Sequence, residues 1–288
     1  MDNKLIKVYV VGGDNSYVNL FLDKIKIVSE IKDANVVLFT GGEDVFPEHY
    51  GEFTGKYTNY NKDRDNREFS KFNEAQKLGK FCLAICRGSQ LLTVLSGGML
   101  AQHVSGHAIG GTHKIHLINE KVDIDITSTH HQMMWPFHLS KSDYTILAKA
   151  KNNLSSTYLN GDDCEKRLPS NFVEPEIIYY KNTNSLCIQG HPEYMPKDSS
   201  AVKYINVLIR EYLEDTVEKV PEEIQGIQGI NIHAGNGILD QVHVADIDLD
   251  AARVRLNEAM RHAGRIVVNQ GPVGVRVDQL DDFFADMR

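Results

Sequence analysis

The sequence predicts an α/β fold: an open, mostly parallel sheet with helices on both faces, followed by a small α+β module at the C-terminus. Short apolar runs without polar alternation, such as residues 35–40, are typical of parallel strands buried on both faces. Stretches of helical periodicity separate these runs, and the order strand, helix, strand implies right-handed crossovers between parallel strands.

Composition divides the chain of 288 residues near Pro221. All 20 lysines lie at or before Lys219, whereas the segment after it contains six arginines and no lysine. We therefore expect a main domain over residues 1–220 and a small appended module over residues 221–288.

Charge and hydropathy exclude several classes of partner. The net charge of −8 argues against nucleic acid as a partner of residues 1–220, because phosphate binding needs clustered Lys and Arg. Neither an apolar run long enough for a membrane span nor a signal peptide is apparent. Four cysteines in a chain of this length are not a disulfide framework. We expect a cytoplasmic protein with free thiols and no membrane contact.

The N-terminal elements follow the α/β order. They are expected as a strand over residues 5–11, a helix over 16–31, a strand over 35–40, a polar loop over 43–63 and a helix over about 65–78. The second strand ends in Gly41 and Gly42. A glycine pair at the carboxyl end of a parallel strand lets the backbone approach a ligand closely, and a plain turn is the alternative.

A sharp turn between a strand and a helix is predicted around Cys86. Five mostly apolar residues, 81–85, precede the cysteine, and a helix-like run over 89–96 follows it. In nucleophile-elbow folds this geometry exposes a reactive side chain beside a helix N-terminus, with small neighbours that permit the turn. Ala84 and Gly88 are those small neighbours here.

The later elements complete the main domain. We expect a hairpin over residues 115–118 and 121–126, a strand over 144–150, an irregular lid-like stretch over 152–174, strands over 177–180 and 185–189, and a closing helix over 200–219.

The candidate catalytic residues are Cys86, His191 and Glu193. A thiol becomes a good nucleophile as thiolate, which a helix N-terminus and a neighbouring imidazole both favour. His191 ends another predicted strand and would lie beside Cys86 if the two strands are adjacent. Glu193 could then hold the imidazole in the tautomer that accepts the thiol proton. The alternative for Cys86 is a small buried hydrophobic residue, which we expect for Cys82 and Cys187.

Several histidines raise the question of a metal site. They are His103, His107, His113, His116, His130 and His131. The spacings that define common zinc sites are absent, so we expect no metal and no cofactor. Solvated loop histidines, with one or two lining a pocket, are the expectation.

Four separated motifs resemble the class I glutamine amidotransferases, and most closely their γ-glutamyl hydrolase branch. They are Cys86-Arg-Gly-Ser-Gln90, Gly41-Gly-Glu-Asp-Val-Phe-Pro47 with Tyr50-Gly-Glu52, Arg64-Asp-Asn-Arg-Glu68, and His191-Pro-Glu193. The resemblance spans residues 5 to about 215 and implies that family's flavodoxin-like fold.

The resemblance implies roles for eight residues. They are a Cys-His-Glu triad of Cys86, His191 and Glu193, backbone oxyanion donors at Gly42 and Arg87, and substrate contacts at Gly41, Gln90 and His131. It also implies attack of the thiolate on a γ-amide carbonyl, a γ-glutamyl thioester, and its hydrolysis by water.

Three functions follow from this reading. The first is a standalone hydrolase that releases glutamate and an amine or ammonia from a γ-glutamyl amide. The second is a glutaminase subunit that passes ammonia to a synthetase partner. The third is a non-catalytic scaffold on the same fold, against which the presence of all three triad residues argues. The amine half of the substrate and a homo-oligomeric state stay open.

The tail contains no titratable cluster that would suggest a second active site. Its predicted order of helix, hairpin and helix resembles small antitoxin modules of the Phd type. We favour instead a fused or regulatory α+β module that packs or dimerises without catalysis.

Overall fold

The computed structural model describes residues 5–169 and 171–218. The boundary near Pro221 and the α+β module predicted for residues 221–288 lie outside the described residues. Both stay predictions.

A nine-stranded sheet organises the described chain, in the order β2-β1-β3-β4-β14-β13-β10-β7-β8. Its strands are β1 Ile6–Val11, β2 Ile25–Ile27, β3 Val36–Phe39, β4 Phe81–Ile85, β7 Ala108–Leu117, β8 Val122–Thr129, β10 Tyr144–Ala150, β13 Pro175–Tyr180 and β14 Ser185–Ile188. The half from β2 to β14 is parallel, and every pair from β14 to β8 is antiparallel. The predicted α/β class is confirmed, with an antiparallel extension beside the parallel half.

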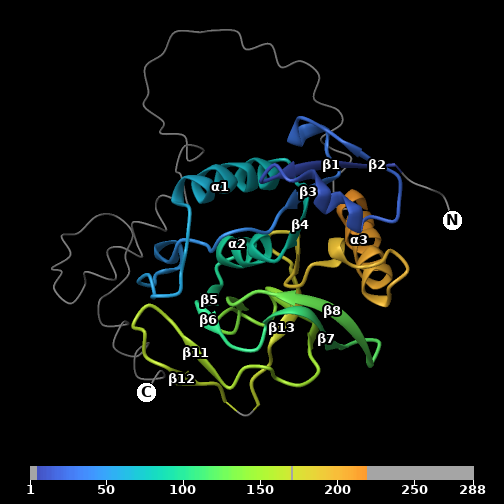
Figure 1. Cartoon of the computed structure of the whole chain (residues 1–288). Helices are drawn as coiled ribbons and strands as arrows, with labels where there is room; N and C mark the ends of the chain where they lie inside the picture. The colour runs from blue at the N-terminus through green and yellow to red at the C-terminus, as the bar shows by residue number, and fades with distance from the viewer. Residues whose placement is uncertain (1–4, 170, 219–288) are drawn as a thin grey trace, which may run out of the picture. The chain divides into compact units, whose positions relative to one another are not determined.

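Helices cover both faces of the parallel half. They are α1 Lys62–Lys77, α2 Arg87–Leu95 and α3 Ser200–Glu218. Alternate residues of β4 face opposite sides: Leu83 and Ile85 belong to the core beneath α3, whereas Cys82 and Ala84 belong to the core beneath α1 and α2. Figure 1 shows α3 on the other side of β4 from α2. This two-sided burial explains the continuous apolar run of β4.

The helix predicted for residues 16–31 is wrong. The segment forms two 3₁₀ turns, Asn15–Leu20 and Ile31–Asp33, with β2 between them. A β-branched run favours the strand, and Ile6 of β1 pairs with Ile25 in parallel register. Asn206 of α3 fixes the turn: its side chain accepts from Leu22 N at 2.9 Å and donates to Leu20 O at 2.8 Å. Tertiary hydrogen bonds thus override a weak helical pattern.

Two small sheets accompany the large one. β6 His103–Val104, β11 Thr157–Leu159 and β12 Lys166–Arg167 form a three-stranded sheet, and β5 Met99–Ala101 pairs with β9 Met133–Trp135. The stretch 152–174, expected to be irregular, therefore contains two short strands. β11 pairs with the distant β6 on one side and with β12 on the other, and the pairing with β6 is not apparent from the local sequence.

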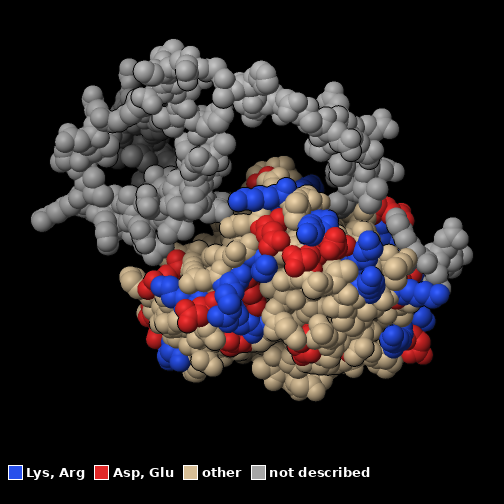
Figure 2. All heavy atoms as spheres, turned by 90° about the horizontal axis from the view of Figure 1, so that it is seen from above, with Lys and Arg blue, Asp and Glu red and all other residues tan. Residues whose placement is uncertain are grey.

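The surface carries both signs of charge. Figure 2 shows Lys and Arg side chains interspersed with Asp and Glu on the face that it presents. Among the described helices, none has the length and apolar character required to cross a membrane.

Candidate active site

Cys86 occupies a strained turn between β4 and α2. Its φ of 50° and ψ of −113° lie in a region that L-residues rarely adopt, as expected for a nucleophile elbow. The Cys86 amide donates to Ile188 O at 2.8 Å, which ties the turn to the end of β14. Ser89 strengthens this link, because its hydroxyl oxygen accepts from Ile188 N at 2.8 Å.

The structure brings the three candidate catalytic side chains together. β4 and β14 are adjacent and parallel, so Cys86 and His191 leave the sheet at the same edge. His191 Nδ1 lies 2.6 Å from Glu193 Oε1, and the imidazole also hydrogen-bonds with the Cys86 side chain. Thr127 of β8 fixes the His191 backbone, since its hydroxyl accepts from His191 N and donates to His191 O, both at 2.8 Å.

The electrostatics favour a charged imidazole. Burial lowers the pKa of His191, but its hydrogen bonds and charge interactions with Cys86 and Glu193 outweigh this and raise the pKa to about 10. An imidazolium beside a sulfur favours the thiolate, which is the nucleophilic form of cysteine. His191 is therefore suited to hold a proton that it can later give to a leaving group.

Two tyrosines that the sequence analysis did not assign contact His191. The Tyr194 ring stacks on the imidazole, with centroids 4.9 Å apart and an interplanar angle of 9°. Tyr17 lies on the turn before β2 with its ring centroid 6.2 Å from the imidazole. Tyr194 directly follows the His-Pro-Glu motif and could have been suspected, whereas nothing in the local sequence connects Tyr17 with residue 191.

A partly buried network of charges holds the glycine turn after β3. The Arg64 guanidinium donates to Gly41 O at 2.8 Å, to Glu43 Oε2 at 2.5 Å and to Glu68 Oε1 at 2.8 Å. Gly42 has φ +148°, and a side chain there would collide with Arg64. Arg64 was visible in the Arg-Asp-x-x-Glu motif, but the sequence offered no role for it.

The Arg87 side chain points away from the chemistry. It is 1% exposed, pairs with Asp65 and Glu68 of α1, and donates from Nε to Glu43 O at 3.1 Å. As the first residue of α2, Arg87 presents a backbone N–H with no partner inside the helix.

A pocket of about 170 Å³ adjoins Cys86. Its lining includes three further predicted site residues, Gly42, Gln90 and His131. Gln90 donates to Gln132 O at 3.1 Å, and His131 Nε2 lies 3.1 Å from Asp44 Oδ1. Gly41 is not part of this lining; a Cβ added to it would lie 2.5 Å from Tyr17 Oη and 3.2 Å from His191 Cε1, and its carbonyl accepts a hydrogen bond from Arg64. The structure therefore places Gly41 as a support of the turn.

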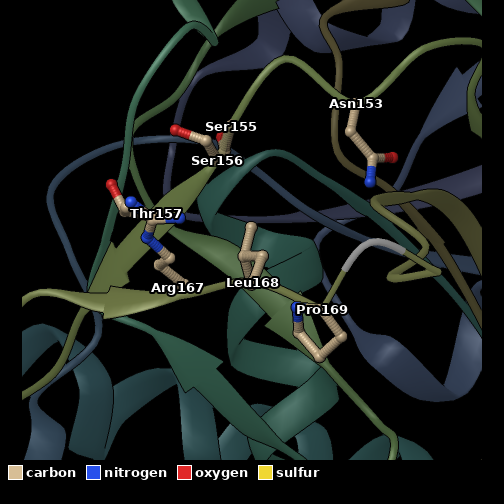
Figure 3. Close-up of a pocket in the computed structure, with 7 residues that line it drawn as sticks. All are labelled: Asn153, Ser155, Ser156, Thr157, Arg167, Leu168 and Pro169. Atoms are coloured by element: carbon tan, nitrogen blue, oxygen red, sulfur yellow. The ribbon is translucent and has the colours of Figure 1, made fainter.

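A larger hollow of about 420 Å³ lies elsewhere, over the β11–β12 region. Figure 3 shows its lining of small polar side chains together with Arg167, Leu168 and Pro169. This lining contains neither cysteine nor histidine. The smaller pocket is the candidate active site because it contains Cys86.

The histidines divide into two groups. His116 is partly exposed, as expected for a loop or edge residue, and His131 lines the pocket rim. His107, His113 and His130 are buried, contrary to the expectation of solvated side chains. Two of them can be buried because carboxylates at the start of β13 are their partners: Glu174 pairs with His107, and Glu176 pairs with His113.

Comparisons with known proteins show a likeness to one family over the first half of the chain. Residues 6–138 match the peptidase C26 family. A Mycobacterium tuberculosis protein, by name a glutamine amidotransferase, is 34% identical over 118 residues, covering 34% of this chain and 38% of its own. A Lactococcus lactis glutamine amidotransferase-like protein is 40% identical over 70 residues, covering 24% of this chain and 30% of its own. The chain thus spans about a third of the length of these curated relatives.

Solved structures show a looser likeness. A GMP synthase subunit from Thermoplasma acidophilum has a TM-score of 0.46 at 17% identity, over 77% of this chain and 98% of its own. A glutamine amidotransferase of Thermotoga maritima has a TM-score of 0.42 at 13% identity, over 76% of this chain and 87% of its own. Because both scores are below 0.5, the family assignment rests on the sequence matches and the motifs. Over residues 6–138 the chain is similar to the peptidase C26 family, and its motifs and named relatives support a place in the class I glutamine amidotransferase superfamily.

Proposed function

We propose that the protein hydrolyses a γ-glutamyl amide through a γ-glutamyl thioester on Cys86. The family match indicates an amidohydrolase or amidotransferase. The observation that supports the finer proposal is the contact of Cys86 with His191 at a strained elbow, with Glu193 2.6 Å from the imidazole.

The first half of the reaction forms the thioester. The Cys86 thiolate attacks the γ-carbonyl carbon, and the carbonyl oxygen becomes an oxyanion. Backbone N–H groups of Arg87 and Gly42 are the proposed donors to it, and losing one such donor costs roughly 3 kcal/mol, about a hundredfold in rate. The imidazolium of His191 protonates the leaving nitrogen as the carbon–nitrogen bond breaks.

The second half releases glutamate. His191, now neutral, removes a proton from water, which attacks the thioester carbon and returns the sulfur as thiolate. Glu193 holds the imidazole through Nδ1, so that the other ring nitrogen faces the reacting groups. Gln90 and His131 are the proposed contacts to the glutamyl group, because both line the pocket beside Cys86.

A substrate screen tests this proposal. Purified protein is assayed for glutamate release from glutamine and from a panel of γ-glutamyl amines, alongside Cys86→Ala and a matched control, Cys164→Ala, at an exposed cysteine. We expect turnover by the wild type and by the control, and none by Cys86→Ala. Unchanged turnover by Cys86→Ala would refute the proposal.

The names of the curated relatives favour a second candidate, a glutaminase that delivers ammonia to a synthetase. The same screen separates the two. A standalone hydrolase turns over its substrate unaided, whereas a glutaminase subunit is nearly silent on glutamine until its partner and acceptor are added.

A further inference from the structure

A second cluster of ionisable side chains lies near the pocket and takes no part in the proposed reaction. It comprises His107, His113, His130, Glu174 and Glu176, all of them buried. They converge from the start of β7, from β7 itself, from the segment after β8 and from the start of β13. Charged and polar groups so deeply buried require partners.

The hydrogen bonds of two histidines determine their tautomers. His130 Nδ1 lies 2.8 Å from Gln132 O, and because a carbonyl only accepts, Nδ1 carries the proton. His130 Nε2 is then an acceptor, and it has no hydrogen-bond partner among the described residues. His107 Nε2 lies 3.2 Å from Glu174 Oε2, which places the His107 proton on Nε2 and leaves a lone pair on Nδ1.

The third acceptor comes from Glu176. Its Oε1 accepts from His113 Nε2 at 2.9 Å, while Oε2 has no partner within the described part of the chain. One ligand atom each from His107, His130 and Glu176 lie within 4.8 Å of one another. Ser128 is the nearest hydroxyl, 3.4 Å from His107 Nδ1, but it donates to His107 O at 2.7 Å. His107 Nδ1 also lies 3.7 Å from Glu176 Oε1. Buried acceptor atoms this close repel one another when no proton lies between them, and a cation between them would remove that repulsion.

We propose that His107, His130 and Glu176 bind one divalent transition-metal ion, with Zn²⁺ as the leading candidate. Two imidazoles and a carboxylate form a ligand set that Zn²⁺ accepts, whereas Mg²⁺ and Ca²⁺ prefer oxygen ligands alone. The three protein ligands leave one position of a tetrahedral ion for a further ligand.

The surroundings match the pattern of known metal sites. Metal-bound histidines usually donate their second ring N–H to a carboxylate or a backbone carbonyl, and metal-bound carboxylates are themselves hydrogen-bonded. Here Glu174 accepts from His107, Gln132 O accepts from His130, and His113 donates to Glu176. Each proposed ligand therefore has its own outer partner.

The proposed metal ion would stabilise one wall of the pocket and would take no part in the reaction at Cys86. His130 and Gln132 line the pocket. Binding of the ion would fix the segment that carries them and so hold the wall on which Gln90 also rests.

Metal analysis of the full-length protein tests the proposal. The wild type is incubated with Zn²⁺, freed of unbound ions by gel filtration, and analysed for zinc, iron and manganese by mass spectrometry. The variants His130→Gln and Glu176→Gln each remove one ligand, and His116→Gln is a matched control at a partly exposed histidine. We expect about one ion per chain in the wild type and the control, and roughly a tenth of that or less in the two variants. Equal metal in all four proteins, or none in the wild type, would overturn the proposal.

A second measurement uses only the wild type, so its result does not depend on whether the variants fold. Co²⁺ replaces Zn²⁺ in tetrahedral sites and absorbs visible light there, so we expect a visible band that saturates near one equivalent and disappears on chelation. The melting temperature should fall when the chelator removes the ion. Absence of the band together with an unchanged melting temperature would show that protons, and not a metal, hold the cluster together.

Discussion

Because α2 and β3 are in close contact at Gly88, the substitution Gly88→Ala tests whether the geometry of the turn at Cys86 controls stability and activity. Gly88 is the second residue of α2, and a Cβ added to it would overlap Phe39 O and lie 2.8 Å from Phe39 C and 3.1 Å from Phe39 Cβ. Most of the obstruction is backbone of β3, so rotation of a side chain cannot relieve it. Either α2 or the end of β3 must move.

Two opposing effects set the size of the change. Alanine in a helix is favoured over glycine by about 0.5–1 kcal/mol, whereas overpacking of this kind costs about 1–3 kcal/mol, so we expect a net loss of about 1–2 kcal/mol in the free energy of unfolding. The activity is more sensitive. Displacing Cys86 from His191 by about 1 Å lowers the rate of thioester formation by roughly a hundredfold.

The assay combines denaturant unfolding with glutamate release. Gly111→Ala is the control, because the nearest atom to its added Cβ is Ile109 O at 4.0 Å and it should leave both measurements unchanged. A Gly88→Ala protein with wild-type stability and wild-type kcat would refute the reasoning.

Three further predictions concern the turn, the triad and the tail. Arg64→Met removes the hydrogen bond to Gly41 O and should lower kcat by roughly 10- to 100-fold with a smaller change in KM; an unchanged kcat would contradict the assigned role of the turn. His191 has a pKa of about 10, raised from 6.5, so its protonation stabilises the fold fully below pH 6.5, and this contribution is lost as the pH rises through 10. Because the proposed reaction needs protonated His191, kcat should also fall at high pH. Glu193→Gln should move both the loss of stability and the fall in kcat to lower pH, and pH profiles that coincide with the wild type would show that Glu193 does not raise the pKa of His191. Truncation after Lys219 should leave a folded, active enzyme, because α3 already buries Ile205 and Ile209 in the core; loss of soluble protein would show that the tail is integral.

The proximity of Cys86 and His191 could be predicted because each residue closely follows an apolar run. Cys86 and His191 follow the buried strands β4 and β14, and parallel neighbours bring the ends of such strands to one edge. The adjacency of the two strands was inferred from the resemblance to known motifs, since Cys86 and His191 are 105 positions apart in the sequence.

Features that depend on distant contacts escaped prediction. The spacing of apolar residues predicted a helix over residues 16–31. The hydrogen bonds of Asn206 and the pairing of β2 with β1 instead determine the conformation of that segment. The burial of His107 and His130 depends on carboxylates at the start of β13, more than 40 residues away in sequence. Periodicity and local motifs report neighbours along the chain, so they could not reveal either arrangement.

Covalent labelling of Cys86 tests the central claim most directly. The full-length wild type, Cys86→Ala and Cys164→Ala are treated with a diazo-ketone analogue of glutamine, and the adduct is counted by intact mass and located by peptide mapping. We predict one adduct, on Cys86, in the wild type and in Cys164→Ala, and none in Cys86→Ala. Equal labelling of the wild type and Cys86→Ala would contradict Cys86 as the nucleophile.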